Sequence, residues 1–170
     1  DCEVMSEPVY SFWNSAHQDH TYHLGDPEEG EERQDVVLYA FRVRVGGTEP
    51  VYAFWDKALQ DRVFHMGEAR VNEEAGRPCF YAFREEGGRD VVPMTSWYVS
   101  ANQETVLHGG EAKAGENKER VEFYAPRKNT SVFTSCSRVM TVLRKNAISQ
   151  QAFRWKAMLL RGGQAPVQVA

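Results

Sequence analysis

The stretch PVYSFW at residues 8–13 returns as PVYAFW at residues 50–55, and a weaker copy, PMTSWY, follows at residues 93–98. A second block repeats with the same spacing, as AHQDHTYHLGD at 16–26, ALQDRVFHMGE at 58–68 and ANQETVLHGGE at 101–111. A third block reads LYAFR at 38–42, FYAFR at 80–84 and FYAPR at 123–127. The offsets are 42 and then 43 residues throughout, so the chain is built from a threefold internal repeat.

Each repeat contains short aromatic and β-branched runs separated by Gly, Pro, Asn or acidic residues, which predicts strands. Three such units bury their aromatic faces only by closing on one another, and the familiar closures are the β-trefoil and the propeller. Propellers normally have four or more blades, so we expect an all-β β-trefoil over residues 1–127, with units at about 8–49, 50–92 and 93–127. A propeller would need a degenerate fourth copy within residues 132–149.

Residues 128–170 form a basic C-terminal extension that lacks the marks of the repeat. Within it, SQQAFRWKAMLL at 149–160 is compatible with a short helix that has Ala152, Trp155 and Leu159 along one face. We expect this extension either to pack on the barrel or to serve a partner, including another copy of the chain.

The net charge of −4 and the acidic clusters at residues 28–32 and 73–74 give no broad attraction for phosphate backbones or anionic lipids. No run approaches the roughly 18 apolar residues that span a bilayer. We therefore expect no nucleic-acid partner and no membrane insertion.

The chain begins Asp1-Cys2 without an initiator Met, which favours removal of a leader and a secreted protein. Three cysteines permit one disulfide, and a bridge between Cys2 and Cys136 would tie the N-terminus to the segment after the repeats, leaving Cys79 as a free thiol. The alternative is three buried free thiols.

The second block carries the candidate binding chemistry. Alternation along a strand turns Tyr22, Phe64 and Leu107 to the core and the following histidines to the other face. We predict three related shallow ligand sites, each with an aromatic stacking surface and polar groups for sugar hydroxyls. Their residues are Trp13, Asn14, Asp19, His23, Trp55, Asp56, Asp61, His65, Tyr98, Glu104 and His108. In the alternative interpretation, the same residues are structural: Trp in the barrel, Gln and Asp in tight turns, and His bonded to backbone.

The third site is expected to be the weakest, because Val99 stands where the first two repeats have Asn14 and Asp56. His17, His20 and His23 lie within seven residues, but strand geometry turns His20 away from the other two, so no metal site is expected. Catalytic and nucleotide-binding motifs are absent from the sequence, and we expect neither enzymatic activity nor a cofactor.

The stretches 8–14 with 19–23, and 50–56 with 61–65, resemble the repeats P-L-Y-R-L-Y-N and D-H-F-Y-T of a secreted family known as a domain of unknown function. Members occur in fungi and attached to bacterial cell-wall hydrolases, so the resemblance implies attachment to a glycan or cell surface. The chain departs from the family where Ser11 or Ala53 replaces the usual Arg. The Q-x-W triplet of ricin-type trefoils is absent, so the sugar sites of that family are not transferred.

We therefore expect a secreted lectin-like protein that binds carbohydrate or a cell surface, with weak contacts that add through multivalency. The alternative is a protease inhibitor that presents the loops at 26–35 or 85–90, and a third interpretation is a structural or storage protein. Repetition of the polar residues in all three units favours ligand binding, because an inhibitor needs only one loop.

Overall fold

The computed structural model describes residues 2–87 and 89–135, and residues 3–133 form one compact unit. The described part is all-β and contains no helix, as the sequence predicts up to residue 127. The expected helix at 149–160 lies outside the described residues. The strands are β1 (Cys2–Met5), β2 (Glu7–Asn14), β3 (Asp19–Leu24), β4 (Glu31–Ala40), β5 (Thr48–Asp56), β6 (Asp61–Met66), β7 (Glu73–Glu74), β8 (Pro78–Phe83), β9 (Val91–Val99), β10 (Glu104–Gly109), β11 (Glu116–Pro126) and β12 (Ser131–Thr134).

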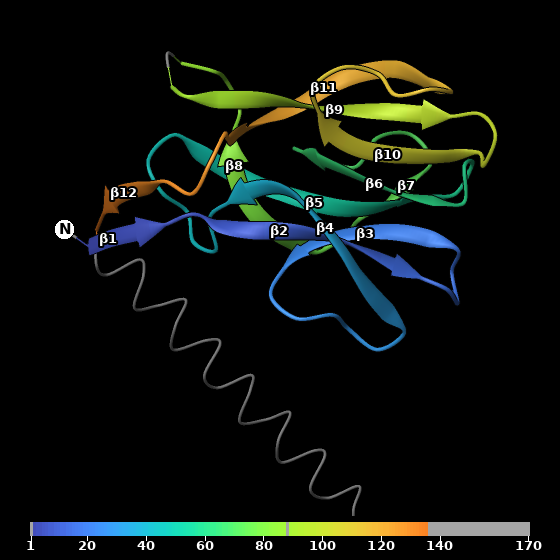
Figure 1. Cartoon of the computed structure of the whole chain (residues 1–170), viewed down its shortest axis with the longest axis horizontal. Coiled ribbons are helices and arrows are strands. Elements are labelled where there is room, and N and C mark those ends of the chain that lie inside the picture. The colour runs from blue at the N-terminus through green and yellow to red at the C-terminus, as the bar shows by residue number, and fades with distance from the viewer. Residues whose placement is uncertain (1, 88, 136–170) are drawn as a thin grey trace, which may run out of the picture. The chain divides into compact units, whose positions relative to one another are not determined.

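Each repeat contributes three antiparallel strands with its first strand in the middle, in the orders β3-β2-β4, β6-β5-β8 and β10-β9-β11 (Figure 1). The first repeat forms a sheet of its own, whereas the second and third share one seven-stranded sheet through the pairing of β8 with β11. The hairpin register is identical in the three repeats. Its equivalent pairs are Trp13 with His20, Trp55 with Arg62, and Tyr98 with Thr105. Strands β1 and β12, from outside the repeats, pair with each other.

The second repeat interrupts its third strand, which is continuous in the other two. The break between β7 and β8 contains Gly76 and ends at Pro78. A Cβ atom on Gly76 would lie 1.2 Å from the carbonyl oxygen of Ala53, so only glycine allows this close backbone approach. Pro78 has no N–H to donate to a ladder, which accounts for the shorter strand.

The repeats join through the ends of their third strands. Phe41 and Tyr81 exchange backbone hydrogen bonds of 3.0 and 2.8 Å, and Phe83 pairs with Tyr124 in the same way between the second and third repeats. At the third junction, where β11 contacts β4, the equivalent residue is Pro126, which has no N–H to donate. The three junctions therefore follow one cyclic order, and among the described residues the third has no strand pairing.

The core consists of equivalent side chains from all three repeats, and it confirms that Tyr22, Phe64 and Leu107 point inward. Each layer takes one residue from each repeat at the 42- and 43-residue offsets. The layers are Val9, Val51 and Met94; Tyr22, Phe64 and Leu107; Leu38, Phe80 and Phe123; and Ala40, Ala82 and Ala125. Because each layer needs all three repeats, no single repeat buries its apolar face alone.

Cys79 lies in β8 as a free, partly buried thiol, and burial raises its pKa to about 11. The sequence predicts a buried free thiol at this position, and the structure shows a free thiol that is partly buried. Cys136 lies outside the described residues, so the bridge between Cys2 and Cys136 stays a prediction. Within the described part of the chain, no helix has the length and hydrophobicity to cross a bilayer.

Candidate functional site

Asn14 and Asp56 are turn elements of the β2–β3 and β5–β6 hairpins. The Oδ1 atom of Asn14 accepts hydrogen bonds from the N–H groups of residues 16 and 17, at 3.1 and 3.2 Å. Asp56 accepts from residues 58 and 59 in the same way, at 2.8 and 3.1 Å. Each hairpin then needs one left-handed residue, supplied by Gln18, Gln60 and Gln103 with φ of 51°, 57° and 55°.

The three predicted histidines of the second block, His23, His65 and His108, form the same buried cluster in every repeat. Each Nε2 lies 2.8 to 2.9 Å from a carboxylate, and each Nδ1 lies against the carbonyl oxygen of the next residue. Each ring also stacks on an aromatic ring of the first strand. The carboxylates are Glu31, Glu73 and Glu116, and the aromatic rings are Phe12, Phe54 and Trp97.

The glutamates of these clusters also cap the loop that precedes them. The Glu31 carboxylate accepts hydrogen bonds from Thr21, from the Glu28 N–H and from His23. Burial acts to raise the pKa of Glu31, but these hydrogen bonds outweigh burial and lower it below its usual value. Both nitrogens of each imidazole are engaged, so this cluster holds the hairpin to the third strand and offers a ligand little free hydrogen-bonding capacity.

Three further predicted site residues, Asp19, Asp61 and Glu104, are buried carboxyl groups that link one repeat to the next. Their exposed fractions are 2%, 4% and 8%. Each carboxyl group contacts, in the next repeat, the residue that comes directly after the equivalent carboxyl residue. The contacts therefore run from the first repeat to the second, from the second to the third, and from the third back to the first. The contacts are Asp19 Oδ2 with Arg62 Nε at 3.9 Å, the Thr105 N–H with Asp61 Oδ2 at 2.5 Å, and Glu104 with His20.

Trp13, Trp55 and Tyr98 are half-buried at equivalent positions on β2, β5 and β9. The Trp13 ring packs against the His20 ring in a tilted arrangement, with ring centroids 4.9 Å apart. None of the three aromatic side chains lines the four cavities between the described repeats that are set out below. The structure therefore does not bring the predicted stacking surfaces together with the polar groups of a pocket.

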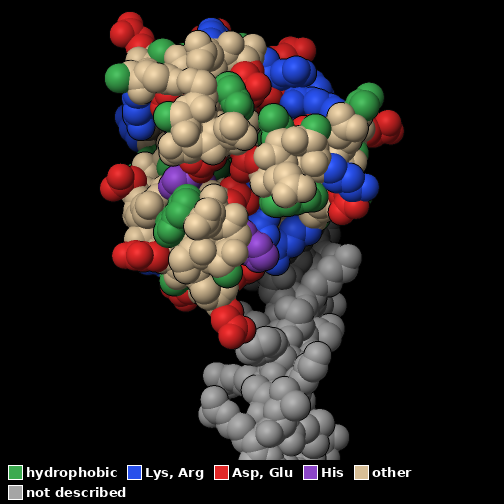
Figure 2. Space-filling view, turned by 90° about the vertical axis from the view of Figure 1, so that its right-hand side faces the viewer, with side chains coloured by type: hydrophobic (Ala, Val, Ile, Leu, Met, Phe, Trp, Pro, Cys, Tyr) green, Lys and Arg blue, Asp and Glu red, His purple; other side chains and the backbone are tan. Residues whose placement is uncertain are grey.

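Cavities lie instead between consecutive repeats, each lined by the hairpin of one repeat or the loop after it and by strands of the next repeat, its second strand included. Figure 2 looks at the hairpin ends, where lobes of the surface surround a hollow containing acidic and histidine side chains. The cavity between the third and first repeats, here called the open cleft, has a volume of about 710 Å³. The first-to-second cleft holds about 250 Å³, and the second-to-third interface has a cavity of about 20 Å³ and an outer hollow of about 340 Å³.

Sequence differences at equivalent positions explain which cleft is open. The second-to-third interface is crossed by the ion pair of Arg70 with Glu122, at 2.5 Å, and the first-to-second cleft by Arg77 with Glu28. In the open cleft, the positions of Arg70 and Glu122 hold Lys113 and Val37. A valine accepts no hydrogen bond, so the pair that closes the second-to-third interface does not form here.

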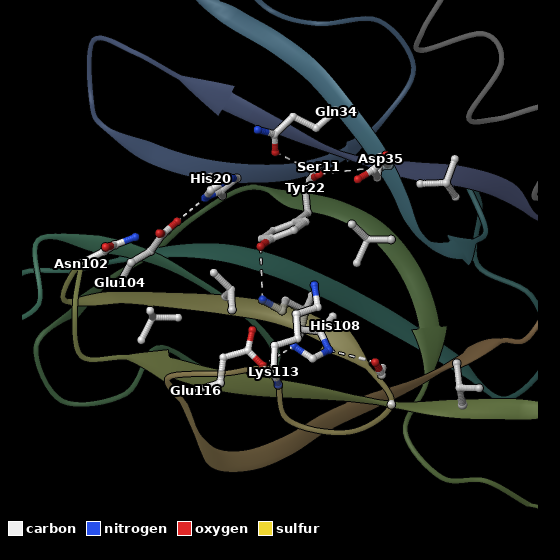
Figure 3. A pocket seen from close by; sticks show the side chains of 18 residues that line it. Ser11, His20, Tyr22, Gln34, Asp35, Asn102, Glu104, His108, Lys113 and Glu116 are labelled. Carbon is white, nitrogen blue, oxygen red and sulfur yellow. Dashed lines mark hydrogen bonds and ion pairs between the residues drawn. The ribbon is translucent and has the colours of Figure 1, made fainter.

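Figure 3 shows how the open cleft is lined. Ser11, Gln34 and Asp35 project from β2 and β4 on one side, and the opposite wall comes from β10 and the loop after it. The hydroxyl oxygen of Tyr22, between the walls, accepts a hydrogen bond from the Leu107 N–H at 3.2 Å. Further polar residues of the cleft are His20, Asn102, Glu104, His108, Lys113 and Glu116.

Only two of the predicted site residues, Glu104 and His108, line the open cleft. His23 lines the first-to-second cleft and Asp56 the outer hollow of the second-to-third interface. The sequence analysis missed Ser11, Gln34, Asp35, Asn102 and Lys113. A signal was present: Asp35 stands where the other repeats have Arg77 and Arg120, so the aligned repeats differ in charge at this wall.

The described residues contain no group of three His, Cys, Asp or Glu side chains arranged to hold a metal ion. Chemically, the open cleft offers amide, hydroxyl, carboxylate and ammonium groups beside a few aliphatic side chains. No protein-family model, curated protein or solved structure was found to match this chain.

Proposed function

We propose that this protein is a secreted lectin-like module that binds a hydroxyl-rich glycan of a cell surface in the open cleft. The observation that carries the proposal is the size and lining of that cleft. Its volume of about 710 Å³ lies within the roughly 300–1,000 Å³ typical of small-ligand sites. Gln34, Asn102 and Lys113 offer N–H donors and Asp35 offers acceptors, the complement that sugar hydroxyls need.

The aliphatic part of the cleft supports the same ligand class. Val36, Val99 and Val106 line it beside the polar groups, and Val36 is exposed. A sugar ring has an apolar face formed by its C–H groups, which these methyl groups cover without a polar penalty. One site for each chain follows, in place of three equal sites, because ion pairs occupy the other two interfaces.

The closure that we propose for the three sheets is the β-trefoil, supported by the three repeats, the shared core layers and the cyclic junctions. We also propose secretion, supported by the exposed Asn129 side chain in an Asn-Thr-Ser glycosylation sequon. The resemblance of residues 8–23 and 50–65 to secreted surface-attachment repeats agrees with both proposals. The Cys2–Cys136 bridge and oligomerisation through residues 128–170 belong to the same proposal.

A glycan array probed with the full chain tests the function, and calorimetry with the strongest glycan tests the site. Replacing Gln34 by Ala should weaken binding about tenfold, because one hydrogen bond to a sugar hydroxyl contributes roughly 0.5–1.5 kcal/mol. Glu119 occupies the equivalent position in the third repeat and lines the second-to-third cavity, so Glu119→Ala is the matched control and should bind normally. Equal losses in both variants would place the ligand elsewhere.

Protease inhibition stays the competing proposal. In the structure the acidic segment predicted as a loop at 26–35 is shorter, because β4 already begins at Glu31, while residues 84–87, 89 and 90 remain outside any strand. Silence across the glycan array, together with tight inhibition of a protease that depends on residues 85–90, would replace glycan binding by this function.

A further inference from the structure

Asp19 is a buried carboxyl group that receives no hydrogen bond from the N–H and O–H groups of the described residues. Its exposed fraction is 2%, and both of its oxygens lack a donor. The nearest cationic group is the guanidinium of Arg62, whose Nε lies 3.9 Å from Oδ2, beyond hydrogen-bonding distance. An ionised carboxylate in this place would lose its hydration without compensation.

Asp61, within hydrogen-bonding reach of Asp19, is buried too, and burial raises its pKa, but unlike Asp19 it receives hydrogen bonds that act to lower it. Its Oδ1 accepts the Arg62 N–H at 2.8 Å and its Oδ2 accepts the Thr105 N–H at 2.5 Å. Backbone donors of this kind stabilise the charged form of a carboxylate. Two ionised carboxylates have no proton with which to form a hydrogen bond, so one of these two side chains must be a neutral acid. Asp61 is better suited to be the ionised acceptor, because backbone N–H groups stabilise its charge.

The other titratable groups around the pair supply little positive charge to Asp19. Glu104 adds a further negative charge, but it is engaged with His20 of the first repeat. The Tyr22 hydroxyl is buried, which raises its pKa; the hydrogen bond from the Leu107 N–H lowers the pKa, and the charges of Glu104 and Asp61 raise it. Arg62 is therefore the one cation near Asp19 among the described residues.

We propose that Asp19 is a proton-binding site that joins the first two repeats: at neutral pH its carboxyl group keeps a proton and donates it to the ionised Asp61. The protein then takes up one proton when it folds. Folding should be favoured in mildly acidic surroundings and weakened as the pH rises, independently of whether the open cleft binds a glycan.

The direction of the pH effect follows from the folded and unfolded states of this carboxyl group. Burial, followed by the hydrogen bond with Asp61 and the charge of Asp61, raises the pKa of Asp19 to about 8. In the unfolded chain an aspartate has a pKa of about 3.9. The proton on Asp19 contributes its full stabilisation of the folded state below pH about 4, and this stabilisation is lost as the pH rises to about 8. Between these two values, the folding constant falls about tenfold per pH unit, because one proton is linked to folding.

The test compares urea unfolding of the full chain and its Asp19→Asn variant at pH 5 and pH 7, with carbon-13 NMR of the aspartate carboxyl groups. The Asn amide donates to Asp61 without a titrating proton, so the ratio of variant to wild-type folding constants should rise about 100-fold between the two values of pH. Asp56→Asn is the matched control, because Asn14 already occupies the equivalent turn. That variant should follow the wild type.

Carbon-13 NMR keeps the proposal testable if Asp19→Asn fails to fold. In the wild type, one aspartate carboxyl signal should report a neutral acid at pH 7. If all aspartates titrate near pH 4, the proposal is wrong. Stabilisation of the wild type by added Ca²⁺ at pH 8, absent from Asp19→Asn, would also overturn it, because the compensating cation would then be a metal ion.

Discussion

Replacing Glu73 by Ala should lower the free energy of unfolding by about 2–6 kcal/mol, because it leaves two interior donors without an acceptor, at roughly 1–3 kcal/mol each. Glu73 and His65 are the most buried of the three equivalent pairs, with side-chain exposures of 3% and 2%. The substitution leaves His65 Nε2 and the Arg70 N–H without their acceptor in the interior. Urea unfolding with intrinsic tryptophan fluorescence measures the change.

The neighbouring Glu74 is the control for this prediction. Its side chain is 57% exposed and pairs with Lys57 at the surface, so Glu74→Ala should change the unfolding free energy by less than about 1 kcal/mol. Glu116→Ala should fall between the two, because its partner His108 is 13% exposed. If Glu73→Ala costs no more than Glu74→Ala, the histidine cluster does not hold the hairpin.

The double substitution Val37→Glu with Lys113→Arg should close the open cleft and lower glycan affinity by about 100-fold, the equivalent of two to three lost hydrogen bonds. It recreates, at equivalent positions, the pair of Arg70 and Glu122 that fills the second-to-third interface. Calorimetry with the strongest array glycan measures the affinity, and thermal unfolding checks that the fold is intact.

The reciprocal variant is the matched control. Arg70→Lys with Glu122→Val gives the second-to-third interface the residues of the open cleft while leaving the open cleft unchanged. This variant should bind the glycan with the affinity of the wild type. The number of bound glycans per chain should stay at one or rise towards two. Unaltered binding in the Val37→Glu, Lys113→Arg variant would show that the glycan does not enter this cleft.

The repeat alone was enough to predict the all-β class, the repeated hairpin and the inward face of the second strand. Tyr22, Phe64 and Leu107 alternate with polar neighbours, and alternation gives the face of the strand on which a side chain lies. It does not give burial, because His23 and His65 on the other face are buried as well. The break at Gly76 was not predicted, because it depends on how closely Ala53 approaches from the neighbouring strand. The lack of an N–H donor at Pro126 matters only because the equivalent residue Phe41 donates to Tyr81 at a junction between repeats, which the sequence does not reveal.

The candidate site was harder to predict, because the residues that recur between repeats are mainly those that hold the fold together. His65 recurs for the hairpin cluster, Asp56 for its turn, and Asp61 for the contact to the next repeat. A ligand role for these residues stays a prediction, but their buried contacts favour the structural interpretation. The open cleft depends on the positions where the repeats differ, such as Asp35 and Val37, whose proximity to the third repeat only the fold reveals.

Burial of the paired carboxyl groups also changes the result expected for a double substitution of Asp19 and Asp61 by Ala. If these two carboxyl groups were exposed ligand-binding groups, the variant would lose binding with an unchanged melting temperature. Because Asp61 holds the Thr105 N–H of the next repeat, we now expect the melting temperature to fall. Glycan affinity of the folded fraction should change little, because neither carboxyl group lines the open cleft.

The most direct test of the open cleft is a titration of the nitrogen-15-labelled protein with the strongest array glycan, followed by amide chemical shifts. Our account predicts saturable shifts at Gln34, Asp35, Asn102 and Gly110, which line the cleft, and none around Trp55. Shifts of similar size around Trp13, Trp55 and Tyr98 would instead show three equivalent surface sites and contradict a single site between the third and first repeats.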